Sequence, residues 1–205
     1  MINLSKGDAP VTLTKTPLVR ATVRWSSHTD YDLYARVLYA DGGTETVAMF
    51  AAEGQPAQAT TSRFPSAVKH LGDVGRTGTG TAEEVLEIRL TDEVRAVVPV
   101  AYSAQSNGTG SFRQYAVSME IDNGIPEQAV TVSAANANDN QRIYSCAVGV
   151  VENTADGIRV HVLEDYSRPG SENRPTVELT SKGWGSKKRQ VVQVNMDAGP
   201  VNVYK

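Results

Sequence analysis

The chain has very little cysteine: Cys146 is the only one in its 205 residues. A single cysteine excludes an internal disulfide and a zinc site built from several thiolates. Cys146 stands in the apolar segment RIYSCAVGVV, residues 142–151. We therefore interpret it as a small buried core residue rather than a catalytic nucleophile.

An excess of positive charge is also missing. Lysine and arginine total 20 against 23 aspartate and glutamate residues, which gives a net charge of −3. This balance provides no overall basic field for nucleic acid or anionic lipid. One basic cluster near the C-terminus offers phosphate contacts as an alternative, but we interpret it as a solvated hairpin tip. Its residues are Lys182, Trp184, Lys187, Lys188 and Arg189.

Long apolar runs are absent as well. The N-terminus, MINLSKGDAP, lacks the basic start and apolar stretch of a signal peptide. We expect a cytoplasmic protein with no membrane span. Nucleic acid is not expected as a partner, which leaves other proteins or self-association with further copies of this chain.

The chain does contain a period-two alternation of apolar and polar residues, interrupted by turns. In EVLEIRLT (84–91), for example, Leu86 and Ile88 share one face. Two Asp-Gly steps, at 41–42 and 156–157, separate alternating segments and predict β-hairpins. About a dozen short strands without a convincing amphipathic helix predict an all-β fold, a two-sheet antiparallel β-sandwich with short or no helices.

Two details of strand pairing follow from the same pattern. Pro99 lies within the apolar run RAVVPVAYSA (95–104). Because proline cannot donate a ladder hydrogen bond, we expect an edge strand or a bulge there. In the tail, VVQVNM (191–196) and VNVY (201–204) are expected to pair across the turn DAGP.

A glycine-rich acidic loop, HLGDVGRTGTGTAEE (70–84), is the main functional signal. Its glycines can take positive φ, so the backbone can curl and direct several carbonyls at one point. Carboxylates and carbonyls are the ligands of Ca²⁺, which takes about six to eight oxygens. The alternative is a set of solvated turn residues. The predicted calcium ligands are Asp30, Asp32, Asp73, Glu83 and Glu84.

A succession of motifs over residues 1–165 resembles the tellurium-resistance TerD-type bacterial stress-protein domain. The resemblance implies a β-sandwich that binds calcium through acidic loops, has no established catalytic activity, and is linked to tolerance of tellurite, phage and other stresses. Residues 166–205 then form a C-terminal extension of the same domain, expected to be a β-hairpin. The motifs are MINLSKGD, TDYDLYARVL, the step His70-x-Gly72-Asp73, the loop ending in Glu83-Glu84, and AYSA…GSFRQYAVSMEIDN.

The acidic loop departs from the family pattern. Val74 replaces an asparagine, Arg76 adds a positive charge, and threonine and alanine fill most of the remaining acidic positions. Because calcium affinity follows ligand charge, we expect weakened metal binding. The thinned loop also favours an alternative function, a metal-independent interaction or structural module acting in a larger assembly.

Catalysis has little support in the sequence. The three histidines, His28, His70 and His161, have no serine or cysteine beside them in a nucleophile-elbow context. Glu83 and Glu84 are adjacent, so on a strand they point to opposite faces and do not flank one scissile bond. We predict that the protein is not an enzyme.

Overall fold

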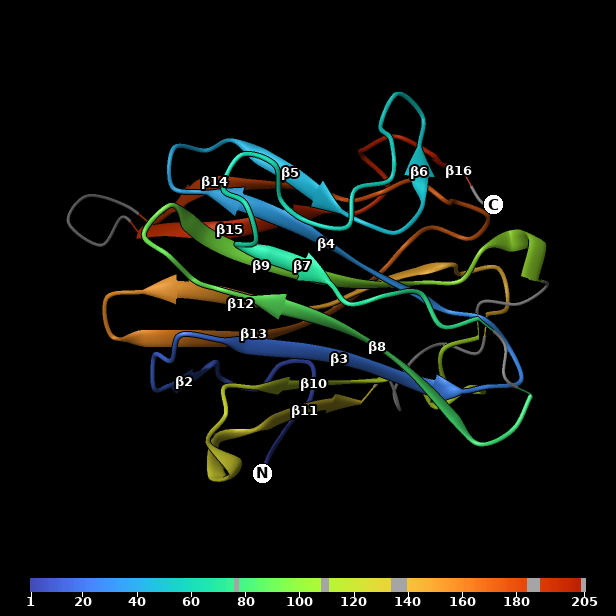
Figure 1. Cartoon of the computed structure of the whole chain (residues 1–205), viewed down its shortest axis with the longest axis horizontal. Coiled ribbons are helices and arrows are strands. Elements are labelled where there is room, and N and C mark those ends of the chain that lie inside the picture. Colours follow the sequence, from blue (N-terminus) through green and yellow to red (C-terminus); the bar gives the residue numbers. More distant parts are fainter. Residues whose placement is uncertain (76–77, 108–110, 134–139, 184–188, 204–205) are drawn as a thin grey trace.

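The chain folds as two six-stranded β-sheets packed face to face, in a computed structural model that describes residues 1–75, 78–107, 111–133, 140–183 and 189–203 (Figure 1). The all-β sandwich prediction is therefore confirmed. The first sheet, sheet A, has the order β1 (Ile2–Leu4), β11 (Val130–Ser133), β10 (Ser118–Asp122), β3 (Val19–Ser26), β8 (Thr81–Ile88) and β7 (Val68–His70). The second, sheet B, has the order β2 (Val11–Leu13), β13 (Gly157–Tyr166), β12 (Ser145–Thr154), β9 (Val94–Tyr102), β4 (Asp32–Tyr39) and β5 (Thr44–Val47).

Four further strands lie outside the two large sheets. β14 (Thr176–Lys182) and β15 (Arg189–Asn195) form an antiparallel pair, and β16 (Asn202–Val203) pairs with β6 (Ala51–Ala52). The described residues contain only two short 3₁₀ turns, η1 (Gln105–Asn107) and η2 (Pro126–Gln128). The described strand pairs are antiparallel, except that β1 runs parallel to β11.

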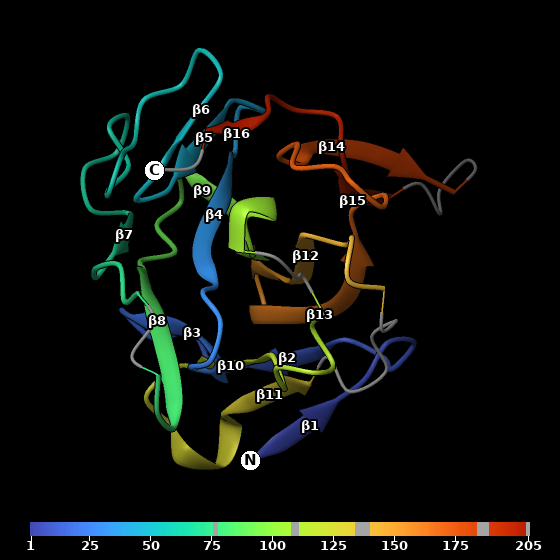
Figure 2. The same ribbon diagram turned by 90° about the vertical axis from the view of Figure 1, so that its right-hand side faces the viewer.

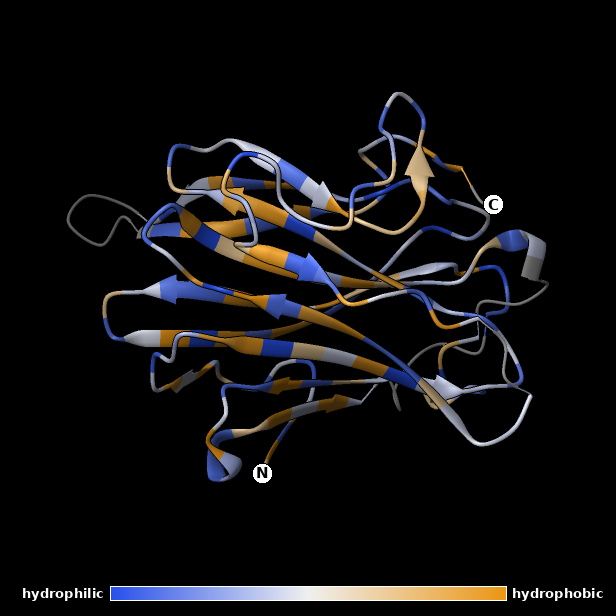
Figure 3. Cartoon of the chain, in the orientation of Figure 1, coloured by the Kyte–Doolittle hydropathy of each residue, from blue (hydrophilic) through white to orange (hydrophobic). Residues whose placement is uncertain are grey.

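The core between the sheets follows from the period-two pattern. Along β8, Ala82, Glu84, Leu86 and Ile88 point inward and are buried, and the residues between them are more exposed. Figure 3 shows this alternation of apolar and polar residues along β3 and β8. The inward side chains of both sheets form one continuous buried cluster, which fixes the two sheets against each other.

Sheet B is covered on its outer face as well. All eight residues of β4 are buried. Its outward residues Tyr34 and Leu38 join a second apolar cluster that includes Val177 of β14 and packs against Val192 of β15. In Figure 2 the β14–β15 pair lies on the side of sheet B that faces away from β3 and β8. The C-terminal segment thus forms a third layer.

The two Asp-Gly hairpins are confirmed. β4 pairs with β5 across Asp41-Gly42, and β12 pairs with β13 across Asp156-Gly157. Both glycines adopt positive φ, +86° at Gly42 and +142° at Gly157. Glycine takes this conformation without the steric cost that other residues meet, which is why the turns form where the sequence places them.

Of the two other pairing expectations, an edge or a bulge at Pro99 is confirmed as a bulge, and the tail pairing is wrong. β9, which contains Pro99, is an interior strand between β12 and β4 rather than an edge. The expected bulge is present. The β12–β9 register shifts between Ala147 and Val151, opposite the part of β9 that contains Pro99. The tail pairing is wrong, because β15 pairs with β14 and β16 with β6.

The tail turns away from β15 for a local reason. Asp197 adopts a φ of +62°, and the Gly199 amide then donates a 2.8 Å hydrogen bond to the Arg174 carbonyl. A Cβ at Gly199 would lie 2.7 Å from the same carbonyl oxygen. The segment after β15 therefore passes beside Arg174 and leads into β16, which pairs with β6.

Candidate metal centre

Three of the five predicted ligands meet in space. One carboxylate oxygen from each of Asp32, Asp73 and Glu84 lies within 4.8 Å of the others. Asp32 begins β4 in sheet B, Glu84 lies on β8 in sheet A, and Asp73 belongs to the loop that joins β7 to β8. The cluster thus joins both sheets and one connecting loop at the end of the sandwich where these segments meet.

The strand geometry of β8 places Glu84 inside. Glu84 shares its face with Ala82 and Leu86, so its side chain enters the space between the sheets and is only 2% exposed. There its Oε2 accepts a 2.6 Å hydrogen bond from the Leu33 amide and its Oε1 accepts one of 3.0 Å from the Val74 amide. Hydrogen bonds to a charged acceptor are stronger than neutral ones, so this carboxylate holds β4 and the loop in place.

His70 supports Glu84 from the end of β7. Its Nδ1 accepts a 3.1 Å hydrogen bond from the Gly72 amide, which leaves the ring proton of a neutral imidazole on Nε2. Nε2 lies 2.8 Å from the Leu33 carbonyl oxygen and 3.3 Å from Glu84 Oε2. His70 is 3% exposed. It is a positioning residue that the ligand prediction omitted, although the His-x-Gly-Asp motif contains it.

Glu83 and Asp30 lie outside the cluster found among the described residues. Glu83 points to the solvent face of β8, where its carboxylate accepts a 2.9 Å ion-paired hydrogen bond from Arg24 Nε and its side chain is 54% exposed. Asp30 is half-buried in the segment before β4. The structure thus separates the adjacent glutamates, and only Glu84 approaches Asp32 and Asp73.

The donor set fits a hard cation. Asp32 is 4% exposed, so two of the three carboxylates are buried close together, where negative charges repel each other. A bound divalent cation removes that repulsion. Carboxylate oxygens bind Ca²⁺, Mg²⁺ and Mn²⁺ alike. These residues therefore indicate a hard divalent cation but do not distinguish among the three ions.

Three further expectations concern Cys146, the basic residues, and a membrane span. Cys146 is fully buried and burial raises the pKa of its thiol, in agreement with a core role. Arg76 of the acidic loop, and Trp184, Lys187 and Lys188 of the basic cluster, lie outside the described residues. Among the described residues, no helix has the length and apolar character needed to span a membrane.

Comparison with known proteins adds no family assignment: no protein-family model matches the chain, and no curated protein matches it.

Proposed function

We propose that the chain is a non-enzymatic calcium-binding domain of the TerD type, acting in a bacterial response to tellurite or other stresses. The observation that carries the proposal is the approach of Asp32, Asp73 and Glu84 to within 4.8 Å. These residues come from the two stretches, TDYDLYARVL and the glycine-rich loop, that also carry the resemblance to the family.

In this proposal the ion acts as a cross-link. Asp32 would hold it from β4, Glu84 from β8 and Asp73 from the loop, and backbone carbonyls or water would complete the oxygen shell. The bound cation supplies positive charge where two buried carboxylates meet. Because three carboxylates are few for calcium, we expect a dissociation constant on the order of 10⁻⁵ to 10⁻³ M.

Calorimetric titration and thermal melting of chelator-treated protein test this proposal. At calcium about 100 times the dissociation constant, mass action raises the free energy of unfolding by about 2.7 kcal/mol. Parallel titrations with Mg²⁺ and Mn²⁺ identify the preferred ion. Asp32→Asn and Asp73→Asn should abolish the heat and the melting shift.

Glu83→Gln is the matched control, because it removes an adjacent carboxylate that pairs with Arg24 instead. It should bind calcium as the wild type does. The proposal fails if the wild type gives neither heat nor a melting shift, or if Glu83→Gln and Asp73→Asn weaken binding equally.

The second candidate, a metal-independent interaction module, is favoured by one observation. Leu71 and Val74, on either side of Asp73, are exposed large apolar residues, at 48% and 38%. Exposed apolar side chains close together are typical of a contact surface. If this candidate is correct, sedimentation will detect self-association that calcium and chelator leave unchanged and that Leu71→Ser with Val74→Ser removes.

A further inference from the structure

A buried arginine lies on β4, the strand next to the edge strand β5 of sheet B. Arg36 lies on the outer face of β4 and is only 6% exposed. Its Nη1 donates to the hydroxyl of Thr46, and its Nη2 donates a long 3.5 Å bond to the hydroxyl of Thr44. Its Nε–H is buried and makes no hydrogen bond with the described residues. Among those residues no carboxylate lies within ion-pair distance of Arg36, so its charge has no counter-ion there.

A second buried guanidinium lies near the first. Arg174 is 1% exposed and donates to three neutral acceptors, Asn202 Oδ1, Gln55 Oε1 and the Phe50 carbonyl. Burial lowers the pKa of Arg174, Tyr34 opposes this effect, and the positive charge of Arg36 adds to the lowering. Burying an unpaired charge is costly, and two like charges near each other add to the cost. Arg174 also lies over the rings of Tyr34 and Phe50, at 5.4 and 5.1 Å from their centroids, so cation–π contacts offset part of its cost. Arg36 is therefore the less compensated of the two charges.

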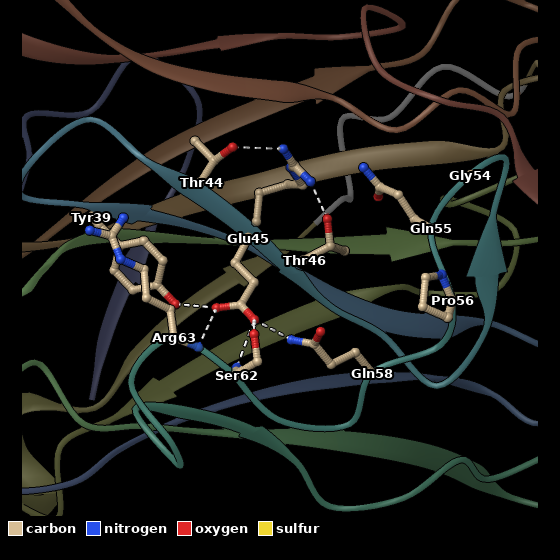
Figure 4. Close-up of a pocket in the computed structure, with 11 residues that line it drawn as sticks. Tyr39, Thr44, Glu45, Thr46, Gly54, Gln55, Pro56, Gln58, Ser62 and Arg63 are labelled. Carbon is tan, nitrogen blue, oxygen red and sulfur yellow. Dashed lines mark hydrogen bonds between the residues drawn. The ribbon is translucent and has the colours of Figure 1, made fainter.

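Arg36 borders a cavity of about 390 Å³ between β4, β5 and the loop after β6 (Figure 4). The cavity wall near Arg36 presents hydrogen-bond donors. The hydroxyls of Thr44 and Thr46 accept from the guanidinium, so each can donate its own proton outward. The oxygen of Gln55 accepts from Arg174, which leaves the Gln55 amide NH₂ as the donor.

Glu45, the acidic residue that lines the cavity, makes its hydrogen bonds with residues other than Arg36. The carboxylate of Glu45 accepts from the amide and hydroxyl of Ser62, both at 2.6 Å, and from Tyr39 and Gln58. Figure 4 shows these contacts on the side of Glu45 that is turned away from Thr44 and Thr46. Among the described residues, no ion pair joins Glu45 to Arg36, although both side chains line the cavity. Glu45 therefore leaves Arg36 without a counter-ion.

We propose that this cavity is an oxyanion-binding site for a small molecule, in which Arg36, Thr44, Thr46 and Gln55 hold a phosphate or carboxylate group. Guanidinium pairs with both groups through parallel N–H donors, and such charge-assisted bonds are among the strongest in proteins. The cavity volume lies in the range of small-molecule sites, about 300 to 1,000 Å³. The site is separate from the candidate metal centre, so each proposal can fail without the other.

Thermal melting of chelator-treated protein tests the proposal with inorganic phosphate, acetate and chloride at matched ionic strength. We expect one of the two oxyanions to raise the melting temperature with saturation, by about 5 to 10 °C at about 100 times its dissociation constant. The comparison of phosphate with acetate identifies the preferred group. General salt exclusion instead gives a rise that does not saturate and is the same in every variant.

Arg36→Met should lose the saturable response and should melt at or above the temperature of the anion-free wild type, because it removes an unpaired buried charge. Arg20→Met, on sheet A, is the control and should keep the response, since Arg20 is a surface residue paired with Glu87. Calorimetric titration of the wild type with the same anions does not depend on how the variants fold. The proposal is overturned if that titration gives no saturable binding, or if Arg36→Met responds as the wild type does.

Discussion

Hydrogen bonds from several neighbouring residues stabilise the ionised carboxylate of Glu45. Burial acts to raise its pKa, but donors led by Ser62 and Tyr39 outweigh this effect and lower the pKa to about 2. Its ordinary value is 4.5, so the folded state favours the ionised form. The stabilisation is therefore fully present above about pH 4.5 and is lost as the pH falls through about 2.

We predict that Glu45→Gln lowers the free energy of unfolding at pH 7 by about 1 kcal/mol, a modest value because Glu45 is partly solvated. The amide NH₂ of glutamine cannot accept from the donors that surround Glu45. Urea denaturation across the acidic range should show the gap between the two proteins closing as the pH approaches 2. A gap that stays constant with pH would mean that the charge of Glu45 contributes nothing.

Strand parity decides which of two adjacent glutamates enters the candidate site. Leu86 and Ile88 define the inward face of β8, and Glu84 shares their parity while Glu83 does not. The sequence alone contained this information, so Glu84 was predictable as the inward residue. Asp73 and Asp32 lie far apart in the sequence, and their approach depends on the packing of β4 against β8, which no local pattern specifies.

Arg36 was not predicted as a site residue. The signal was present, because an arginine interrupts the apolar segment DLYARVLYA. On a half-exposed strand such a residue is an ordinary solvent-facing position. Here β14 covers the outer face of β4, where Val177 joins the cluster that contains Tyr34 and Leu38 on either side of Arg36, and Arg36 itself is buried. Its role therefore depends on contacts that form across more than a hundred residues of sequence.

At the scale of single elements, the β12–β13 turn depends on Gly157. A Cβ there would lie 2.4 Å from the carbonyl oxygen of Leu13 on β2. Gly157 also has a φ of +142°, which strains any residue with a side chain. We predict that Gly157→Ala lowers the free energy of unfolding by about 3 kcal/mol or more, as measured by urea denaturation.

Gly42→Ala is the matched control for this substitution. Gly42 occupies the other Asp-Gly turn with a φ of +86°, but no atom lies within 4 Å of a Cβ built there. Its cost should stay near 1 to 2 kcal/mol, which is the penalty for the backbone conformation alone. Equal losses in the two variants would show that contact with β2 has no effect on stability.

Local elements were predictable, and distant pairing was not. The period-two strands and the two Asp-Gly hairpins depend on neighbours within about ten residues, which sequence patterns report well. The pairing of β16 with β6 joins residues 202–203 to residues 51–52. The interior position of Pro99 is possible because the bulge in β12 alters the ladder beside it. Neither feature has a local signal.

At the scale of the whole molecule, the C-terminal layer is part of the folded core. It covers Tyr34, Phe50 and Tyr102, all at most 1% exposed. Tyr102 donates a 2.6 Å hydrogen bond to Glu172, and Arg174 donates to the Phe50 carbonyl. Removing this segment would uncover a large apolar face of sheet B.

We predict that a chain ending at Ser167 loses cooperative unfolding, binds a hydrophobic dye and aggregates. Each buried aromatic or aliphatic residue that becomes exposed costs about 1.5 to 3 kcal/mol, and the total exceeds the stability of a typical domain. Calorimetry and dye fluorescence of the two chains provide the comparison. A truncated chain that melts as sharply and at the same temperature as the full chain would make residues 168–205 a dispensable addition.

The strand order also determines how long an early strand waits for its partner while the chain is being synthesised. β2 is among the first segments synthesised, yet its partner in the sheet is β13, with Leu13 opposite Ile158. At about 5 to 20 residues per second, β2 waits about 7 to 30 s for that partner. Throughout this interval β2 has no partner strand and its backbone hydrogen-bonding groups are exposed, whereas β4 has its hairpin partner β5 almost at once.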